Sequence, residues 1–593
     1  MRSARSALTA AVCVIAAMLA LPAGAAAHAQ LLGSVPADGA TLRSAPSLFY
    51  FEFNQSVGGT LGAVRVYDAA GHEVDTLSII HPDGKQSWIG VGLKSGLPDG
   101  TYVATYRVIS ADTHIVYGGA EFNIGHASSS SVSVSGLIAR DSAGEPTIVT
   151  FGAVRALDYV TIALAAGGLC FLAFCWLPAL AAASGGGGWP EASRAFARRT
   201  ERILGATIVL GLLVSLLGIV LQGADAAGIA FWNSLKGPVL ENTIESRFGL
   251  VWGGRFIVWL LLGGLLFAPR LRGRSAVPVL AEGSGGLARP SAVRAGLLGL
   301  CAVLLVITPS LSGHASVQSP VWAFLPADIA HVAGAAVWVG GVALLAFALP
   351  AATRCLEPAE RTGLLADALG RFSPIALGCV IALAIGGAIA AYIDVRTLSA
   401  LFQSTYGRLL LIKTAFFLGL LVAGWNQRSR IIPGLTSLRA RFESPGAIGL
   451  GARRTLRTEL VMMAGALAAT AILVAYAPPI DAANGPFSTS ATLGAATLEM
   501  TVEPARVGPN TIHLYLIDAK TGQPYTATKE LTVQARLPQK GIGPLTLRVS
   551  RAGPGHYIAT GAALEPEGEW TIAVTDRISE FEQAAHTVTV PIR

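Results

Sequence analysis

Residues 203–222 read ILGATIVLGLLVSLLGIVLQ, an apolar run without a charged side chain. About twenty such residues in a helix cross the hydrocarbon core of a bilayer. Seven more long apolar runs, six of them with one or two charged residues, occur near residues 153–181, 248–268, 292–309, 328–350, 373–393, 408–425 and 459–477. Hydrophobic residues make up 52% of the 593 residues and charged residues 13%, a balance too apolar for a soluble chain. We therefore predict a membrane protein whose residues 151–478 form a bundle of eight transmembrane α-helices.

Arginine is distributed unevenly between the two sets of connecting loops. The loops on one side, beginning with residues 182–202, are rich in arginine, whereas the others hold only Lys236, Arg247 and Arg396. The positive-inside rule places the arginine-rich loops in the cytoplasm, so the segments before and after the bundle lie outside. The net charge of +7 then reflects membrane topology, and it predicts contact with a lipid bilayer and none with nucleic acid.

The first 27 residues have the pattern of a secretory signal peptide. Arg2 and Arg5 precede an apolar stretch from Ala7 to Leu21, and Ala25 and Ala27 are small residues at the expected cleavage position. Cleavage there makes His28 the first residue of the mature chain. The export signal and the loop charges together predict the cytoplasmic (inner) membrane of a bacterium, with both terminal domains on the periplasmic side.

An N-terminal histidine is a candidate metal ligand, because its α-amine and imidazole can form one chelate. Asp112 and His114 follow the alternating run Thr101–Ile109, and residues two apart in a strand-like segment project to the same face. Two imidazoles, an amine and a carboxylate are ligands that suit Cu(II). Residues 28–126 contain no Met or Cys, so the sulfur ligands that Cu(I) prefers are absent from this segment.

The same residues resemble the copper-resistance protein C (CopC) family, small periplasmic β-sandwiches that bind copper at the mature N-terminus. The matching stretches are His28–Leu31, Ser34–Gly39, Leu97–Tyr102 and Tyr106–His114. The resemblance implies a Greek-key β-sandwich over residues 28–126, a linker over 127–150, and Cu(II) ligands at His28, Asp112 and His114. Where many members have Phe-Ser-Glu, this chain has Phe53-Asn54-Gln55, so an amide stands where a further carboxylate ligand could be.

Polar residues near the outer ends of the membrane spans are costly in hydrocarbon unless they face a partner or a cavity. Asp328, His331 and Trp338 share one stripe of a helix, and His314 lies in an outer loop from which it could fold back toward His331. We predict that His314, Asp328 and His331 form a membrane entrance site for a cation, with interfacial anchoring as the alternative. Asp158 and Asp394 also lie near outer helix ends. For Lys413 and Arg255 a structural salt bridge or snorkelling is the simpler interpretation.

The membrane part resembles the copper-resistance protein D (CopD) family, multi-span partners of the CopC family. The matching residues are Leu311–Ala315, His331, Trp338–Gly341, Thr405–Lys413 and Asn426. The resemblance covers roughly residues 150–478 and makes copper the cation expected at the entrance site. The membrane cysteines show no Cys-x-x-Cys spacing, so they are interpreted as small hydrophobic residues.

Residues 485–593 alternate apolar and polar positions between Pro and Gly turns, which predicts a second β-sandwich outside the membrane. Gly555-His556-Tyr557 and Glu567–Trp570 resemble a YtkA-like domain. His513, His556 and His586 are dispersed along this segment without the spacing of a metal site. A docking or stabilising role is therefore expected for this domain, with no ligand assigned.

These observations predict a non-enzymatic copper protein that captures Cu(II) outside the membrane and passes it to a permease domain, in copper uptake, homeostasis or resistance. The expected partners are the copper ion and an extracytoplasmic copper donor or acceptor protein. Two alternatives stay open. A copper monooxygenase also uses an N-terminal histidine, although Asp112 would favour Cu(II) and resist its reduction. A haem cytochrome would need His314 and His331 to face each other as axial ligands.

Overall fold

The computed structural model describes residues 29–592 except 30, 60–61, 111–114, 129–131, 133, 135, 138–143, 183–187, 236, 270–275, 278, 280–290, 396, 475, 477, 480–486, 504, 522 and 554. The described residues form two compact units. The first unit comprises Val149–Ile219 and Arg247–Ala477 and is helical. The second unit comprises Ala25–Ile148, Val220–Ser246 and Pro478–Arg593, and it holds all the β-strands.

The N-terminal part of the second unit is a sandwich of two four-stranded sheets, as predicted. Its strands are β1 (Leu31–Val35), β2 (Ala40–Leu42), β3 (Leu48–Phe53), β4 (Val64–Asp68), β5 (Asp75–Ile80), β6 (Trp88–Leu93), β7 (Gly100–Ile109) and β8 (Ile115–Ile124). One sheet has the order β1-β3-β6-β5 and the other β2-β8-β7-β4. All neighbouring pairs are antiparallel except β2 and β8, which run parallel.

Alternation of apolar residues produces the core of this sandwich. In β3 the side chains of Phe49, Phe51 and Phe53 are buried while their neighbours are only partly covered. Phe49 stacks on Phe122 of the opposite sheet, with ring centroids 5.4 Å apart. Beyond the sandwich, the linker residues Val132 and Leu137 are also buried, packed on Tyr67 and Val103 at the outer face of the second sheet. The described part of the linker is therefore partly anchored to the sandwich.

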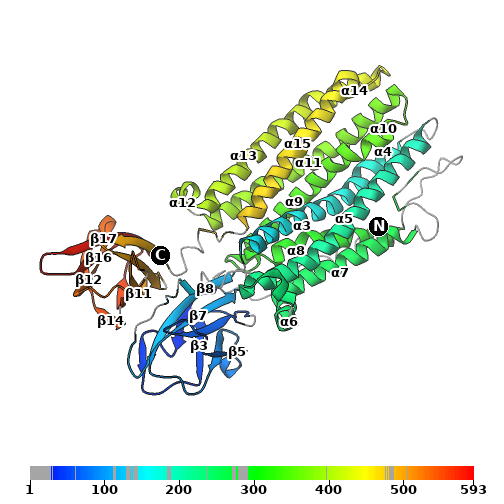
Figure 1. Cartoon of the computed structure of the whole chain (residues 1–593). Helices are drawn as coiled ribbons and strands as arrows, with labels where there is room; N and C mark the ends of the chain where they lie inside the picture. The colour runs from blue at the N-terminus through cyan, green and yellow to red at the C-terminus, as the bar shows by residue number, and fades with distance from the viewer. Residues whose placement is uncertain are drawn as a thin grey trace. The chain divides into compact units, whose positions relative to one another are not determined.

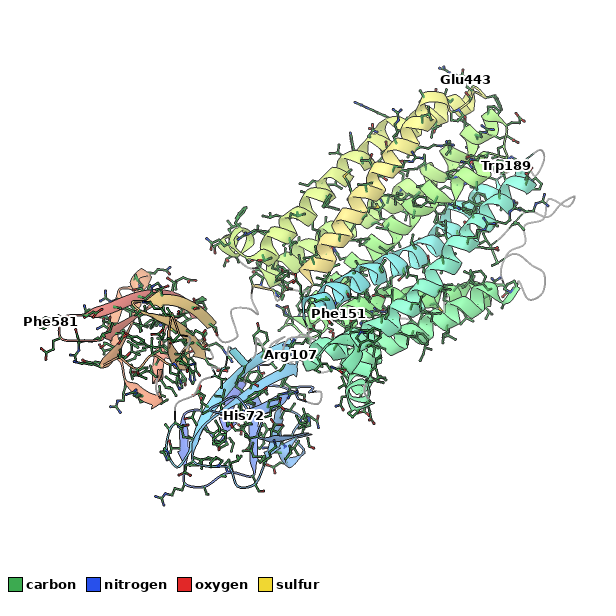
Figure 2. The ribbon with its side chains drawn as sticks, in the orientation of Figure 1. His72, Arg107, Phe151, Trp189, Glu443 and Phe581 are labelled. Atoms are coloured by element: carbon green, nitrogen blue, oxygen red, sulfur yellow. The ribbon has the colours of Figure 1, made fainter. Side chains whose placement is uncertain are left out.

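The C-terminal part of the second unit is another two-sheet sandwich, which confirms that prediction. Its strands are β9 (Phe487–Leu493), β10 (Ala496–Glu503), β11 (Gly508–Asp518), β12 (Glu530–Leu537), β13 (Ile542–Leu547), β14 (Val549–Gly553), β15 (His556–Leu564), β16 (Gly568–Arg577) and β17 (Gln583–Ile592). The sheet orders are β14-β15-β11-β10-β9 and β13-β12-β16-β17. Trp570 is fully buried in the shared core, whereas Phe581, in the turn before β17, projects into solvent (Figure 2).

The helical unit contains long helices laid side by side (Figure 1). Among the described residues, eight helical stretches are long and apolar enough to cross a membrane, which confirms the predicted number. They are Glu145–Ala181 (α3 and α4), Trp189–Ala227 (α5), Arg247–Phe267 (α7), Ala292–Leu311 (α8), Val321–Thr353 (α9 and α10), Pro358–Asp394 (α11), Thr405–Ala440 (α13 and α14) and Gly446–Leu473 (α15). Two short helices, α6 (Gly237–Glu245) and α12 (Leu398–Gln403), lie in the connections.

Several helices extend beyond the apolar runs in the sequence because polar residues continue them. Helix α11 begins with Pro358 at its first position and with a capping box between Glu357 and Glu360, well before the predicted start at residue 373. Small residues then allow close packing. A Cβ atom on Gly340 of α9 would lie 2.2 Å from the carbonyl oxygen of Ala163 in α3, so only glycine permits this approach.

Candidate metal centres

The three predicted Cu(II) ligands, His28, Asp112 and His114, lie outside the described residues. Their immediate chain neighbours are described, and these neighbours meet. The backbone N–H of Ala29 donates to Oγ of Ser110 at 2.8 Å, and Ala29 is buried. Residues adjacent to the predicted ligands are thus joined by a hydrogen bond across 81 positions of sequence.

Gln55 also contacts Ser110. Its Nε2 donates to Oγ of Ser110 at 2.9 Å, and its Oε1 is buried without a hydrogen-bond partner among the described residues. Gln55 is the amide for which the resemblance described above leads one to expect a carboxylate. In this chain its described contact is with Ser110, so it supports the segment that leads to Asp112.

Strand pairing brings together the two described residues nearest to Asp112 and His114 that lie in strands. Ile109 at the end of β7 is the direct partner of Ile115 at the start of β8. Residues 110–114 therefore connect two paired strands at one end of the sheet. Whether Asp112 and His114 project to one face is a prediction that falls outside the described residues.

In the membrane unit, His331 joins three helices. On α9, its Nδ1 donates to the carbonyl oxygen of Leu383 on α11 at 3.0 Å, and its Nε2 lies 3.4 Å from Nζ of Lys413 on α13. Gly386 and Gly387 of α11 make room for the ring, since a Cβ on Gly386 would lie 2.9 Å from the Cβ of His331. The Nδ1 hydrogen bond leaves the lone pair of a neutral imidazole on Nε2.

Asp328 lies one turn before His331 on α9, and its carboxylate acts electrostatically on Lys413. Asp328, His331 and Lys413 therefore form one polar group between helices. The sequence predicts Asp328 and His331 at this site but predicts only a structural role for Lys413. His314 begins a short 3₁₀ helix, His314–Ser316, and its side chain is not among those described. Its approach to His331 stays a prediction. The bis-histidine haem alternative is weakened because Nε2 of His331 faces an ammonium group.

The other aspartates considered for the entrance site already have structural partners. Asp158 of α3 forms an ion pair with Arg255 of α7, with Oδ2 and Nη1 2.5 Å apart and both side chains buried. Arg255 also donates to Thr308 of α8 at 2.8 Å, which confirms a structural salt bridge for this arginine. Asp394 accepts a hydrogen bond from the Tyr406 hydroxyl at 2.8 Å.

Within the described part of the chain, no group of three or more His, Cys, Asp or Glu side chains converges in a way that could hold a metal ion. The described cysteines, Cys170, Cys175, Cys301, Cys355 and Cys379, are free thiols. Burial raises the free-energy cost of a thiolate in apolar surroundings, which agrees with their interpretation as small hydrophobic residues.

One interpretation needs correction. The sequence predicts His513 and His556 to be dispersed because they are 43 residues apart, yet Nδ1 of His513 and Nε2 of His556 lie 3.4 Å apart. Pairing of β11 with β15 brings them together. A signal was present in the sequence, because both residues lie in strands whose neighbouring positions are apolar, but spacing along the chain could not pair them.

Comparison with known proteins gives matches over most of the chain. Residues 31–125 match the family described as CopC domain, residues 146–323 that described as Copper resistance protein D-like, N-terminal domain, and residues 366–473 that described as Copper resistance protein D. Copper transport protein CutJ of Bacillus subtilis (strain 168) is 26% identical over 569 residues, which cover 95% of each chain. Copper resistance protein D of Pseudomonas syringae pv. tomato is 27% identical over 280 residues, or 46% of this chain and 81% of that protein.

Two solved structures are similar to the N-terminal region. CopC from Methylosinus trichosporium OB3b is 25% identical, with a TM-score of 0.15, over 16% of this chain and 93% of that one. PcoC, a methionine-rich copper resistance protein from Escherichia coli, is 22% identical, with a TM-score of 0.14, over 16% of this chain and 98% of that one.

Proposed function

Because this chain is a CopC/CopD fusion with eight candidate membrane spans, we propose that it captures Cu(II) outside the cytoplasmic membrane and passes it to its own membrane domain. The chain is a multi-pass membrane protein of the copper transport and resistance class. Our proposal adds the capture site, the oxidation state and the transfer. It also places both β-sandwiches on the periplasmic side of a bacterial inner membrane, on the grounds of the export signal and the arginine-rich loops.

The capture site consists of His28, Asp112 and His114. The observation that carries this assignment is the hydrogen bond from Ala29 to Ser110, because it holds the residue after His28 beside the segment that contains the other two ligands. A terminal amine, two imidazoles and a carboxylate then complete a set of nitrogen and oxygen donors. This set favours Cu(II), which prefers such ligands in a tetragonal arrangement.

In the membrane domain, we assign the entrance to Asp328 and His331, with His314 as a further ligand. The Nε2 lone pair of His331 is the described donor atom in this group, and the neighbouring Lys413 ammonium opposes a second cation nearby. Copper binding at His331 therefore requires Lys413 to turn away or to lose its proton. Asp328, one turn away, supplies the carboxylate that offsets the added charge.

Fusion of the two domains serves the transfer, because donor and acceptor sites on one chain meet at a local concentration that does not depend on expression level. The matched families are transport and resistance proteins, and we propose no catalytic reaction. A monooxygenase at His28 would show itself by sustained turnover with ascorbate and oxygen or peroxide. An extracytoplasmic copper donor or acceptor protein is the partner that such a chain would need.

One experiment with two variants tests both halves of the proposal. His28→Ala should abolish tight Cu(II) binding by the purified full-length chain, measured by competition with a chelator and by electron paramagnetic resonance. His331→Ala should leave that binding intact and stop copper accumulation by cells that express the protein. His72→Ala is the matched control, because the side chain of this histidine is 79% exposed and its Nδ1 lies 3.1 Å from Asp68 at the sandwich surface.

Undiminished Cu(II) affinity in His28→Ala would contradict the capture site. Equal copper content in cells with wild-type and His331→Ala protein would contradict the transfer. Cellular copper measured with the chain deleted and overexpressed, under scarce and excess metal, separates uptake from sequestration.

A further inference from the structure

A second group of histidines lies on the C-terminal sandwich, away from the proposed capture site. In β11, Leu514 and Leu516 point into the sandwich core, so His513 and Tyr515 lie on the outer face of the sheet. His556 of β15 is the direct cross-strand partner of Tyr515 and lies on that same face. The side chains of His513 and His556 are nevertheless each only 4% exposed.

The N-terminal sandwich, which belongs to the same compact unit, supplies a carboxylate to each histidine. Oδ2 of Asp38, in the turn between β1 and β2, lies 2.7 Å from Nε2 of His513. Oε2 of Glu121, on β8, lies 2.8 Å from Nδ1 of His556. Glu121 also accepts a hydrogen bond from the Tyr515 hydroxyl, and its backbone N–H donates to Asp38 at 2.8 Å.

These contacts bear on which ring nitrogens carry hydrogen. Nε2 of His513 is placed to donate its hydrogen to Asp38, whereas Nδ1 of His556 lies 2.8 Å from Oε2 of Glu121 without the alignment of a hydrogen bond. The remaining nitrogens, Nδ1 of His513 and Nε2 of His556, face each other at 3.4 Å. Across this gap one ring can donate an N–H to the other, or the lone pairs of both nitrogens can bind one metal ion.

Carboxylates surround the two histidines. Burial by itself would lower the pKa of His513, but the carboxylates of Asp38, Glu121 and Glu503 outweigh it and raise that pKa to about 9. Burial would raise the pKa of Glu121, but His556, His513 and Tyr515 hold it below its usual range. The negative charge on this face therefore favours a cation.

The two rings are also aligned for a metal ion. Their centroids are 5.6 Å apart and their planes differ by 9°, while the facing nitrogens are 3.4 Å apart. The difference between these distances is about one ring width, so the imidazoles lie end to end in nearly one plane. Two nitrogens that each bind one metal ion at roughly 2 Å lie about 2.8 Å apart when the N–metal–N angle is a right angle. They lie about 4 Å apart when the three atoms are in line. The observed separation falls within this range.

We propose that His513 and His556 form a second copper site, in which one cuprous ion lies between Nδ1 of His513 and Nε2 of His556. Histidine ligands commonly donate their second N–H to a carboxylate, which is the arrangement that Asp38 provides for His513, and the Glu121 carboxylate lies beside Nδ1 of His556. Because no group of three or more metal-ligating side chains converges anywhere in the described residues, this pair offers too few donors for tetragonal Cu(II) and suits a two-coordinate ion. The inference rests on the proposed function only in taking copper as the cargo, and it includes no redox step.

The test measures Cu(I) binding by the full-length chain in detergent, under ascorbate and in competition with a chromophoric Cu(I) chelator. His513→Gln and His556→Gln should each weaken binding at this site by more than about 100-fold, beyond the usual effect of changing an outer-shell residue. Asp38→Asn, which keeps both imidazoles, should weaken it about 10- to 100-fold. His586→Gln is the matched control, because His586 lies on β17 in the opposite sheet of the same sandwich.

X-ray absorption of the loaded protein should show two nitrogen ligands and no sulfur. Wild-type Cu(I) affinity in both His513→Gln and His556→Gln would overturn the proposal, as would a sulfur-coordinated ion. If a glutamine variant fails to fold by circular dichroism, unchanged affinity in Asp38→Asn is the result that overturns it. His28→Ala separates the two sites: it should remove Cu(II) capture and leave the Cu(I) measurement unchanged, so either proposal can fail alone.

Discussion

The two β-sandwiches of this chain share an architecture but hold their histidines at different places. In the N-terminal sandwich, the proposed ligands are the mature terminus and the connection between β7 and β8. In the C-terminal sandwich, His513 and His556 lie within strands, on a sheet face covered by Asp38 and Glu121. A site at the end of a sheet is open to loading from solvent. A site within a sheet depends on the domain that covers it, so copper binding and domain docking become linked.

The largest expected effect comes from moving the mature terminus. Insertion of one glycine between Ala27 and His28 keeps every side chain but separates the α-amine from the imidazole of His28. We expect Cu(II) affinity to fall by more than about 100-fold, a larger loss than usually follows when a residue that supports a metal ligand is replaced. Cu(I) binding at His513 and His556 should stay unchanged. Chelator competition measures both, after mass spectrometry has confirmed the new terminus.

A glycine inserted between His126 and Ala127, which are both exposed, is the control for a lengthened chain. Full Cu(II) affinity with a verified N-terminal glycine would mean that the α-amine is not a ligand. The contrast between a terminal site and a site within a sheet would then no longer hold.

An intermediate effect is expected at Ser110. Ser110→Ala removes the acceptor for the Ala29 N–H and for Gln55, and leaving such buried donors unpaired costs about 1 to 3 kcal/mol each. Because Ser110 orients both ligand segments, we expect Cu(II) affinity to fall about 10-fold. Ser128→Ala is a matched control, since Ser128 accepts the Thr101 N–H at 2.9 Å at the other end of β7. Equal Cu(II) affinity in the two variants would show that Ser110 is purely structural.

The smallest effect tests the covered face of the C-terminal sandwich. Burial, and secondarily Asp38, raises the pKa of Glu503 to about 8, and its Oε1 has no hydrogen-bond partner among the described residues. A carboxyl group whose pKa is raised by folding favours the folded state below its unfolded pKa, and this contribution is lost as pH rises through about 8. Glu503→Gln should therefore match wild type in thermal midpoint at pH 4 and exceed it by a margin that grows up to pH 9.

Calorimetry of the metal-free chain measures these midpoints. Glu580→Gln, in an exposed turn, controls for the loss of one negative charge. A wild-type midpoint at pH 9 as high as that of Glu503→Gln would show that this face opens to water and would weaken the idea of a covered site.

The membrane helices could be predicted from the sequence because hydropathy alone determines which segments enter a bilayer. The run at residues 203–222 lies within α5, and the run at 373–393 lies within α11. The helix ends could not be predicted so well. Polar residues continue α11 back to Pro358, where a capping box between Glu357 and Glu360 starts it, and hydropathy does not register such residues.

Pairings between distant residues could not be predicted. A charged residue within an apolar span indicates that Arg255 needs a partner, but the sequence does not say that the partner is Asp158 of α3. The same holds for His513 and His556, which only the register of β11 on β15 brings together. The N-terminal ligands His28, Asp112 and His114 are predicted from the resemblance to a known family, lie outside the described residues and stay predictions.

Strand β8 limits how copper can travel between the two sandwich sites. It begins at Ile115, directly after His114, and carries Glu121 six positions later in an unbroken ladder with β7. At about 3.3 Å per residue these positions are about 20 Å apart, far beyond the reach of one ion shared between two ligand sets. The proposed Cu(II) site at the terminus and the proposed Cu(I) site between His513 and His556 would therefore load and empty separately, each without a ligand shared with the other.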